Sequence, residues 1–177
     1  MTTYIALLRG INVGGHNKMK MAELKQLLET MGLKRVQTYI QSGNVIFESE
    51  EKPSQLSERI EEGIKNTFGI STFVILRTAL EFEEITKKCP YSEETFSEGE
   101  SLSIAFLAES LSEEGKSSLE KFNQDIDEYF SEGKEIYLYL RQSIRNSKLA
   151  IQIQKLGIPV TIRNWKTTTK LVALSKK

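Results

Sequence analysis

The order of apolar runs along the chain limits its fold more than any other feature of the sequence. Short runs with the composition of β-strands alternate with longer segments in which apolar residues recur at helical spacing. Before residue 90 the order is strand, helix, strand, strand, helix, strand. The predicted elements of this first series are Thr3–Leu8, Met21–Met31, Val36–Ile40, Val45–Phe47, Pro53–Phe68 and Thr72–Leu76.

The same order returns after residue 101. The predicted elements of the second series are Leu102–Leu107, Ser112–Phe122, Ile126–Phe130, Glu135–Leu140, Asn146–Leu156 and Val160–Ile162. A helix that begins at the capping-box residues Thr78 and Glu81 separates the two series, and a helix over Trp165–Leu174 comes after the second. The βαββαβ order is typical of ferredoxin-like folds. The sequence therefore predicts an α+β protein of two tandem ferredoxin-like (alpha-beta plait, βαββαβ) units with a C-terminal helix.

A polar, acidic stretch lies between the two series. We predict a first unit over residues 1–89 with a glycine loop and a Gln-Ser-Gly-Asn turn, a linker over 90–101, and a second unit over 102–177 with a basic C-terminal helix. A chain of 177 residues is long enough for two small domains.

Composition narrows the class of protein. A hydrophobic content of 39% with 3 prolines is that of a globular chain. No apolar run approaches the roughly 20 residues of a membrane span, so no membrane partner is predicted. Met1–Tyr4 lacks the basic region of a signal peptide, and the single cysteine, Cys89, allows no internal disulfide, so we expect a cytoplasmic protein. One His and one Cys disfavour a zinc site, and neither a metal nor a cofactor is predicted.

The net charge of zero conceals a strong asymmetry along the chain. Residues 1–47 carry a balance of +4, residues 48–135 a balance of −13, and residues 136–177 a balance of +9. In one interpretation the basic ends and the acidic middle simply attract one another. In the other, both basic ends face one anionic ligand.

Two polar segments are predicted to meet in the first series. The first two strands of a βαββαβ sheet are parallel with the third between them, so the loop Arg9–Lys18 and the turn Gln41–Asn44 share one end of the sheet. Both are rich in glycine and amide side chains. Gly10 and Gly15 have the outer spacing of a P-loop, but the Lys and the Ser or Thr of that motif are absent. The alternative interpretation is a tight strand-to-helix turn.

Two basic segments are predicted to meet in the second series. Ser143–Lys148 and Thr161–Lys166 come after strands that end on the same side, and each contains Ile-Arg-Asn before a helix. Helix N-termini favour anions, and arginine supplies paired donors for phosphate or carboxylate. For Arg163, Asn164 and Trp165 the alternative is helix capping with an aromatic packing anchor.

No catalytic pair is visible in the sequence. His16 has no carboxylate near it along the chain and Cys89 shows no base, so whether the protein is an enzyme is left open. The strand aromatics that could stack nucleic-acid bases are Tyr4, Tyr39, Phe47, Tyr137 and Tyr139. Because no RNP-like pattern accompanies them and the middle of the chain is acidic, nucleic acid is disfavoured as a partner.

Three segments together resemble one known family. The chain carries R-G-I-N-V-G-G-H-N-K at 9–18, T-Y-I-Q-S-G-N-V at 38–45 and T-I-R-N-W-K-T-T-T-K-L at 161–171. These resemble the signature of the mainly bacterial, uncharacterised family catalogued as domain of unknown function sixteen ninety-seven (DUF1697). The resemblance implies tandem ferredoxin-like units and brings no established activity. The family commonly has Asn after the Trp, where this chain has Lys166.

The resemblance also implies that the motif residues form a site. These residues are Arg9, Asn12, Gly14, Gly15, Lys18, Gln41, Ser42, Asn44, Arg163, Asn164, Trp165 and Lys170. The leading hypothesis is a small anionic ligand, such as a nucleotide or a phosphorylated metabolite, in a cleft between the two units. The predicted roles are anion binding by Arg9, Lys18 and Arg163, close backbone approach at Gly14 and Gly15, orientation by Gln41 and Asn44, and stacking by Trp165.

Two alternatives belong to other classes of protein. One is a regulatory or protein-interaction module in which the motifs are structural staples. The other is a weak single-stranded nucleic-acid binder. No oligomeric state is predicted.

Overall fold

The structure is a computed structural model that describes residues 1–122 and 126–177. It divides into two compact units. Unit 1 comprises Met1–Glu84 and Lys170–Lys177, and unit 2 comprises Ile85–Thr169. The described residues form two four-stranded antiparallel sheets and six α-helices, which confirms the predicted α+β class.

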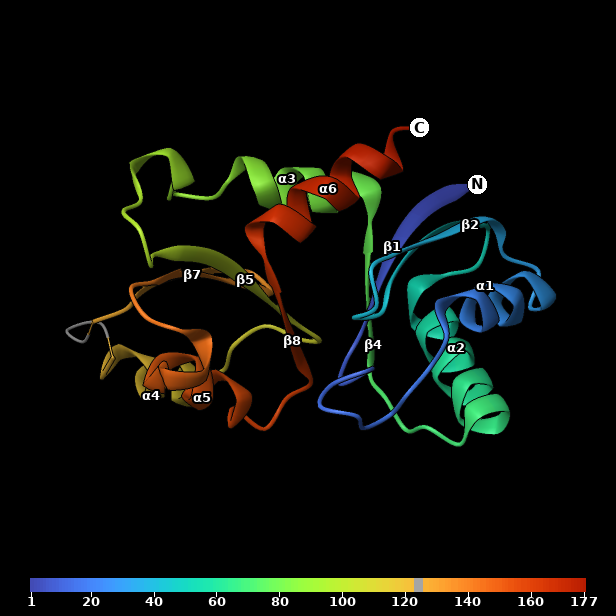
Figure 1. The fold of residues 1–177 in the computed structure, drawn as a ribbon, viewed down its shortest axis with the longest axis horizontal. Helices are drawn as coiled ribbons and strands as arrows, with labels where there is room; N and C mark the ends of the chain where they lie inside the picture. The colour runs from blue at the N-terminus through green and yellow to red at the C-terminus, as the bar shows by residue number, and fades with distance from the viewer. Residues whose placement is uncertain (123–125) are drawn as a thin grey trace. The chain divides into compact units, whose positions relative to one another are not determined.

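Unit 1 contains a sheet with the strand order β2-β3-β1-β4, covered on one face by two helices. Its elements are β1 (Thr2–Leu8), α1 (Met21–Thr30), β2 (Lys34–Tyr39), β3 (Asn44–Ser49), α2 (Pro53–Phe68) and β4 (Val74–Thr78). Figure 1 shows α1 and α2 side by side next to these strands. Every pair of neighbouring strands is antiparallel.

The core of unit 1 forms between an apolar face of the sheet and the apolar stripes of α1 and α2. Alternate residues of β1, among them Ala6 and Leu8, point to the helices, where Leu24, Leu56 and Ile60 present an apolar stripe at helical spacing. Full burial of such an aliphatic side chain contributes about 1.5–3 kcal/mol. The glycine loop and the turn therefore lie on a well-packed frame.

Unit 2 repeats the arrangement with the order β6-β7-β5-β8. Its elements are β5 (Ser101–Leu107), α4 (Glu113–Glu120), β6 (Glu128–Glu132), β7 (Glu135–Leu140), α5 (Lys148–Gln154) and β8 (Val160–Asn164). Helices α4 and α5 pack on one face of this sheet, where Leu119 and Ile153 meet Leu107 and Leu138 in a buried cluster (Figure 1).

The remaining helices are α3 (Ala79–Lys87), α6 (Trp165–Ser175) and two short 3₁₀ turns, η1 (Glu93–Thr95) and η2 (Ile144–Asn146). The predicted capping box of α3 is confirmed, because the Thr78 N–H donates to Glu81 Oε1 at 2.8 Å and the Glu81 N–H donates to Thr78 Oγ1 at 3.1 Å. None of the helices within the described ranges is long and apolar enough to cross a membrane.

Several element boundaries predicted from the sequence are wrong by one or two residues. Strand β4 begins at Val74, after Thr72, whose hydroxyl donates to the Arg9 carbonyl at 2.6 Å. Helices α4 and α5 begin one residue after Ser112 and Ser147, because each serine accepts a hydrogen bond from the third residue along and so acts as the N-cap.

The predicted strand Ile126–Phe130 is also displaced, since β6 spans Glu128–Glu132. The residues before β6 are bonded to the chain just after β7 instead of to a neighbouring strand. The Arg141 N–H donates to Asp127 Oδ1 at 2.8 Å, and the Arg141 guanidinium donates to the Ile126 carbonyl at 2.6 Å. Side-chain hydrogen bonds of this kind cannot be predicted from the spacing of apolar residues.

Candidate functional site

The glycine loop and the Gln-Ser-Gly-Asn turn meet at one end of the unit 1 sheet. The Leu8 N–H donates to the Gly43 carbonyl at 2.8 Å. Gly43 has φ +86°, and a Cβ at this position would lie 2.9 Å from the Leu8 Cβ. The turn therefore needs glycine for its backbone conformation and for its close approach to β1. The convergence predicted from strand order is confirmed.

Asn12 joins the two segments through its side chain. Its Nδ2 donates to the carbonyls of Gln41 at 2.8 Å and Met19 at 2.9 Å, and its Oδ1 accepts from the Met19 N–H at 2.8 Å. Asn12 has φ +57°, a left-handed conformation that asparagine tolerates better than most residues. The start of α1 is thus held against the turn by one amide group.

The tip of the glycine loop is a small hairpin. The His16 N–H donates to the Val13 carbonyl at 2.9 Å, and Gly14 and Gly15 have φ +56° and +79°. Positive φ at both central residues is the signature of a type I′ turn, which explains the two glycines. Asn17 Nδ2 closes the base by donating to the Gly10 carbonyl at 3.0 Å.

A pocket of about 630 Å³ lies beside this hairpin and the start of α1. Its lining residues are Asn12, Gly15, Lys18, Met19, Lys20, Glu23 and Gln41. Four of these were predicted as site residues from the sequence. Lys20 and Glu23 were missed, although their place on either side of the first helical residue, Met21, was a signal that could have found them.

The charged side chains that line this pocket have no partners among the described residues. Within residues 1–122 and 126–177, the side chains of Lys18, Lys20, Glu23 and Gln41 make no hydrogen bond or ion pair. Lys20 occupies the N-cap of α1 in an extended conformation and provides no side-chain cap. The start of α1 therefore offers N–H groups and a partial positive charge beside two lysines.

The other predicted residues of unit 1 support the loop or lie outside the pocket. Asn44 is fully buried, and its Nδ2 donates to the Tyr39 carbonyl and to Ser42 Oγ, both at 2.9 Å. Arg9 does not line the pocket, and its N–H donates to the Phe73 carbonyl at 3.0 Å. Gly14 lies at the exposed hairpin tip, and Lys170 is exposed on α6.

The predicted residues of unit 2 are engaged locally. Arg163 is buried and donates to Thr161 Oγ1 at 2.6 Å and to the Ile162 carbonyl at 3.2 Å. Burial lowers its pKa to about 10, so the guanidinium stays charged at neutral pH. Asn164 Oδ1 accepts from the Thr167 N–H at 2.8 Å, which confirms the capping alternative for Asn164. Trp165, the first residue of α6, is half-buried.

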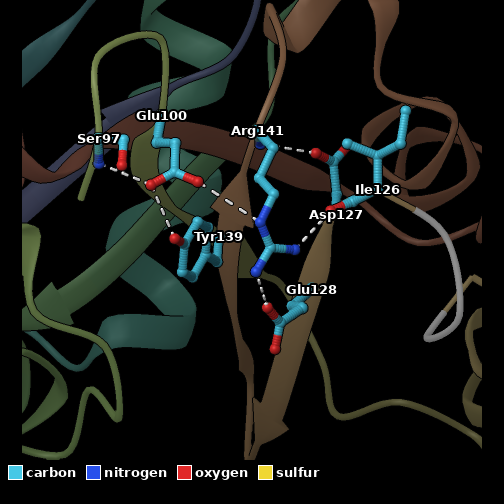
Figure 2. Close-up of polar contacts among 7 residues, drawn as sticks. All are labelled: Ser97, Glu100, Ile126, Asp127, Glu128, Tyr139 and Arg141. Atoms are coloured by element: carbon cyan, nitrogen blue, oxygen red, sulfur yellow. Dashed lines mark hydrogen bonds and ion pairs between the residues drawn. The ribbon is translucent and has the colours of Figure 1, made fainter. Parts of the chain in front are cut away.

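A polar network in unit 2 escaped the sequence-based prediction (Figure 2). Arg141 Nε lies 3.4 Å from a Glu100 carboxylate oxygen, its guanidinium also pairs with Glu128, and it lies 4.5 Å from the centre of the Tyr139 ring. Glu100 accepts from the Ser97 N–H at 2.7 Å and the Tyr139 hydroxyl at 2.8 Å, and these bonds lower the pKa of its carboxyl group. The partners are far apart in sequence, so no local pattern marks them.

This network also bears on the charge asymmetry. Arg141 belongs to the basic C-terminal segment, whereas Glu100 and Glu128 belong to the acidic middle. Lys176 and Glu83 form a further pair of this kind within unit 1, at 3.2 Å. The interpretation in which the basic ends and the acidic middle attract one another therefore accounts for part of the asymmetry.

The part of the chain that the structure describes holds no metal cluster, and its cysteine is not activated. No group of three or more His, Cys, Asp or Glu residues there could hold a metal ion. The Cys89 thiol is half-buried and donates to the Tyr91 carbonyl at 3.5 Å, and burial raises its pKa. Such a thiol is a weak nucleophile at neutral pH.

Comparison with known proteins identifies the family. No match was found among curated proteins. A bacterial structure described as the conserved bacterial protein SP0830 from Streptococcus pneumoniae is 30% identical, with a TM-score of 0.80 and 98% of each chain covered. The model of the family described as "Protein of unknown function (DUF1697)" matches residues 1–137. The chain therefore belongs to the DUF1697 family.

Proposed function

We propose that unit 1 binds a small anionic, nucleotide- or phosphate-like ligand in the pocket beside the glycine loop. One observation carries the proposal: Lys18 and Lys20 lie just before Met21, the first residue of α1, this helix start has no side-chain cap, and neither lysine has a partner among the described residues. Backbone N–H groups at a helix start bind phosphate and carboxylate groups through hydrogen bonds and the helix dipole.

The frame around the pocket supports binding by holding these groups in place before a ligand arrives. Asn12 fixes the start of α1 against the turn, and the hairpin at Gly14 and Gly15 is closed by its own backbone bonds. A preorganised site loses less conformational entropy on binding. In this proposal Lys18 and Lys20 bind the anion and Gln41 orients the ligand.

The proposal is confined to unit 1. Ser42 and Asn44 act by shaping the turn, and the ligand does not need to reach them. Direct contributions of Arg9, Arg163, Asn164, Trp165 and Lys170 to ligand binding stay predictions from the sequence. No reaction is proposed.

Calorimetric titration with inorganic phosphate, a nucleoside monophosphate and a dicarboxylate tests the proposal. Lys18→Ala and Lys20→Ala should each weaken the best ligand about tenfold, the effect of one charge-assisted hydrogen bond. Lys25→Ala is the matched control, because Lys25 is an exposed lysine of α1 that does not line the pocket. Loss of binding in all three variants, or no binding to the wild type, would overturn the proposal.

A protein-interaction module is the second candidate function. The observation that favours it is that Asn12, Asn17 and Asn44 use their amide groups to fasten the chain itself. In that case no anion raises the melting temperature of the wild type.

We also infer that each unit is a ferredoxin-like (alpha-beta plait) unit, supported by the strand orders β2-β3-β1-β4 and β6-β7-β5-β8. A cytoplasmic location stays a prediction that rests on the single cysteine, Cys89.

A further inference from the structure

The pocket that carries the proposed function contains one group that opposes an anion. Glu23 lies in the first turn of α1, lines the pocket with Lys18 and Lys20, and is exposed. Its carboxylate has no hydrogen bond or ion pair with the described residues 1–122 and 126–177. A site built only to hold a bare phosphate would gain nothing from this negative charge.

We propose that the ligand carries a hydrogen-bond donor, a hydroxyl or ammonium group, in addition to its anionic group, and that Glu23 binds this donor. The inference rests on the proposed function, because Lys18 and Lys20 must hold the anionic group first. Glu23 is then a specificity-determining residue. It repels bare anions and attracts anions whose body presents a donor.

The size of the pocket agrees with a ligand that extends beyond one phosphate group. A volume of about 630 Å³ lies in the range of sites that enclose whole metabolites. Gln41 lines the same pocket and adds an amide that can both donate and accept. Two cations, one carboxylate and one amide together match a polyhydroxy or amino phosphate ester better than a simple anion.

A structural role for Glu23 is the competing explanation. A carboxylate in the first turn of a helix is stabilised by the helix dipole, by about 0.3–1 kcal/mol. Glu113 and Glu114 occupy the first turn of α4 in unit 2, where Ser112 caps the helix. A purely structural Glu23 would change the affinity for all phosphates in the same direction, so the test must compare ligands.

The experiment measures dissociation constants by calorimetry for a matched set of phosphates. Glycerol 3-phosphate and n-propyl phosphate share the phosphate group and a three-carbon chain, but only the first carries hydroxyl donors. O-Phosphoethanolamine supplies an ammonium donor, and inorganic phosphate is the bare anion. Wild-type protein should bind the better of the two donor-bearing esters about tenfold more tightly than n-propyl phosphate, the effect of one hydrogen bond to a charged group. The stronger of the two identifies the donor.

Glu23→Gln is the decisive variant, with Glu29→Gln as its control on the same helix. Glu29 is an exposed acid in the last turn of α1 and does not line the pocket. Glu23→Gln should lose most of the preference for the donor-bearing ester, while its affinity for n-propyl phosphate stays equal to or rises above that of the wild type. Glu29→Gln should keep the wild-type preference.

The possible failures are distinguishable. If n-propyl phosphate and inorganic phosphate bind through Lys18 but wild-type protein shows no preference for a donor, the proposed function stands and this inference is wrong. It is also wrong if Glu23→Gln and Glu29→Gln weaken all ligands equally. If no phosphate binds at all, the proposed function fails and the inference fails with it.

Discussion

In both units, corresponding backbone hydrogen bonds hold the end of the first strand. In unit 1 the Leu8 N–H donates to the Gly43 carbonyl at 2.8 Å, and the Arg9 N–H donates to Phe73 at 3.0 Å. In unit 2 the Leu107 N–H donates to the Lys134 carbonyl at 2.8 Å, and the Ala108 N–H donates to Pro159 at 2.9 Å. Each first strand is thus held between a hairpin turn and the chain before the last strand.

The two units differ in the segment between this frame and the first helix. In unit 2 residues 108–112 lead directly to α4, where Ser112 Oγ accepts from the Gly115 N–H at 3.0 Å and two acids occupy the first turn. In unit 1 residues 9–20 build the hairpin and reach α1 at Lys20, which provides no side-chain cap. Ser112 thus caps the helix start of unit 2, whereas no side chain caps the helix start of unit 1.

The lysines at the two helix starts also differ in whether they form an ion pair. The corresponding pocket of unit 2 has a volume of about 240 Å³ and includes Lys116, whose Nζ lies 3.6 Å from a Glu113 carboxylate oxygen. Lys18 and Lys20 have no such partner among the residues that the structure describes. The start of α1 is therefore the candidate anion site. At the equivalent position in unit 2, Ser112 caps the helix and Glu113 pairs with Lys116.

The largest expected effect comes from the hairpin turns. Gly43→Ala should lower the free energy of unfolding by about 3 kcal/mol, because a Cβ would lie 2.9 Å from Leu8 Cβ and φ is +86°. Gly133→Ala, in the turn of unit 2, should lower it by only about 1 kcal/mol, since φ is +60° but a Cβ would make only an ordinary contact, 3.9 Å from Glu135 Oε1. Urea denaturation measures both. Equal losses would show that the close approach in unit 1 is not what requires glycine.

The next effect is the loss of the Asn12 amide. Asn12→Gly keeps the left-handed backbone accessible and removes three hydrogen bonds, so unfolding free energy should fall by about 2 kcal/mol. Asn17→Gly removes one bond and should have about half the effect. Both are measured by urea denaturation. A loss no larger for Asn12→Gly than for Asn17→Gly would contradict the central role given to Asn12.

A smaller effect with two readouts comes from placing a cap on α1. Lys20 already has the extended backbone of an N-cap, with φ −79° and ψ +129°. Lys20→Ser should therefore raise the free energy of unfolding by about 1 kcal/mol and at the same time weaken phosphate binding. Ser112→Ala in unit 2 should lower the stability by a similar amount. Stabilisation by Lys20→Ser without any loss of phosphate affinity would separate the helix start from the binding site.

The smallest expected effect concerns Ile40. This β-branched residue has φ +50° and an exposed fraction of 48%, so its conformation is strained and its side chain gains little from burial. Ile40→Gly should raise the free energy of unfolding by about 0.5 kcal/mol and so raise the melting temperature. This is the difference between relief of strain and the added entropy of the unfolded chain. A fall in the melting temperature would show that the Ile40 side chain contributes contacts that outweigh the strain.

The fold was predictable where local signals agree with tertiary packing. Helix α2 runs from Pro53 to Phe68 as predicted, because a proline at its start, an apolar stripe and the left-handed Gly69 all specify the same limits. Prediction failed at Thr72 and Ile126, where side-chain bonds to distant segments decide the strand ends.

The site was predictable only in part. The meeting of Arg9–Lys18 and Gln41–Asn44 follows from the strand order and could be predicted from the sequence. Lys20 and Glu23, which line the pocket, were missed because a charged residue at a helix start is usually solvated, although their place beside Met21 was a signal. The burial of Arg163 was also invisible, since only the packed unit shows that it donates to Thr161 and Ile162.

A ¹H–¹⁵N NMR titration of the wild-type protein with inorganic phosphate would show directly whether the start of α1 is an open anion site. Such a site predicts saturable shifts concentrated in the backbone amides of Gly15 and residues 18–23, with no saturable shift at residues 112–115 of unit 2. Shifts of equal size at both helix starts, or none at residues 18–23, would contradict the claim that unit 1 alone holds an open anion site.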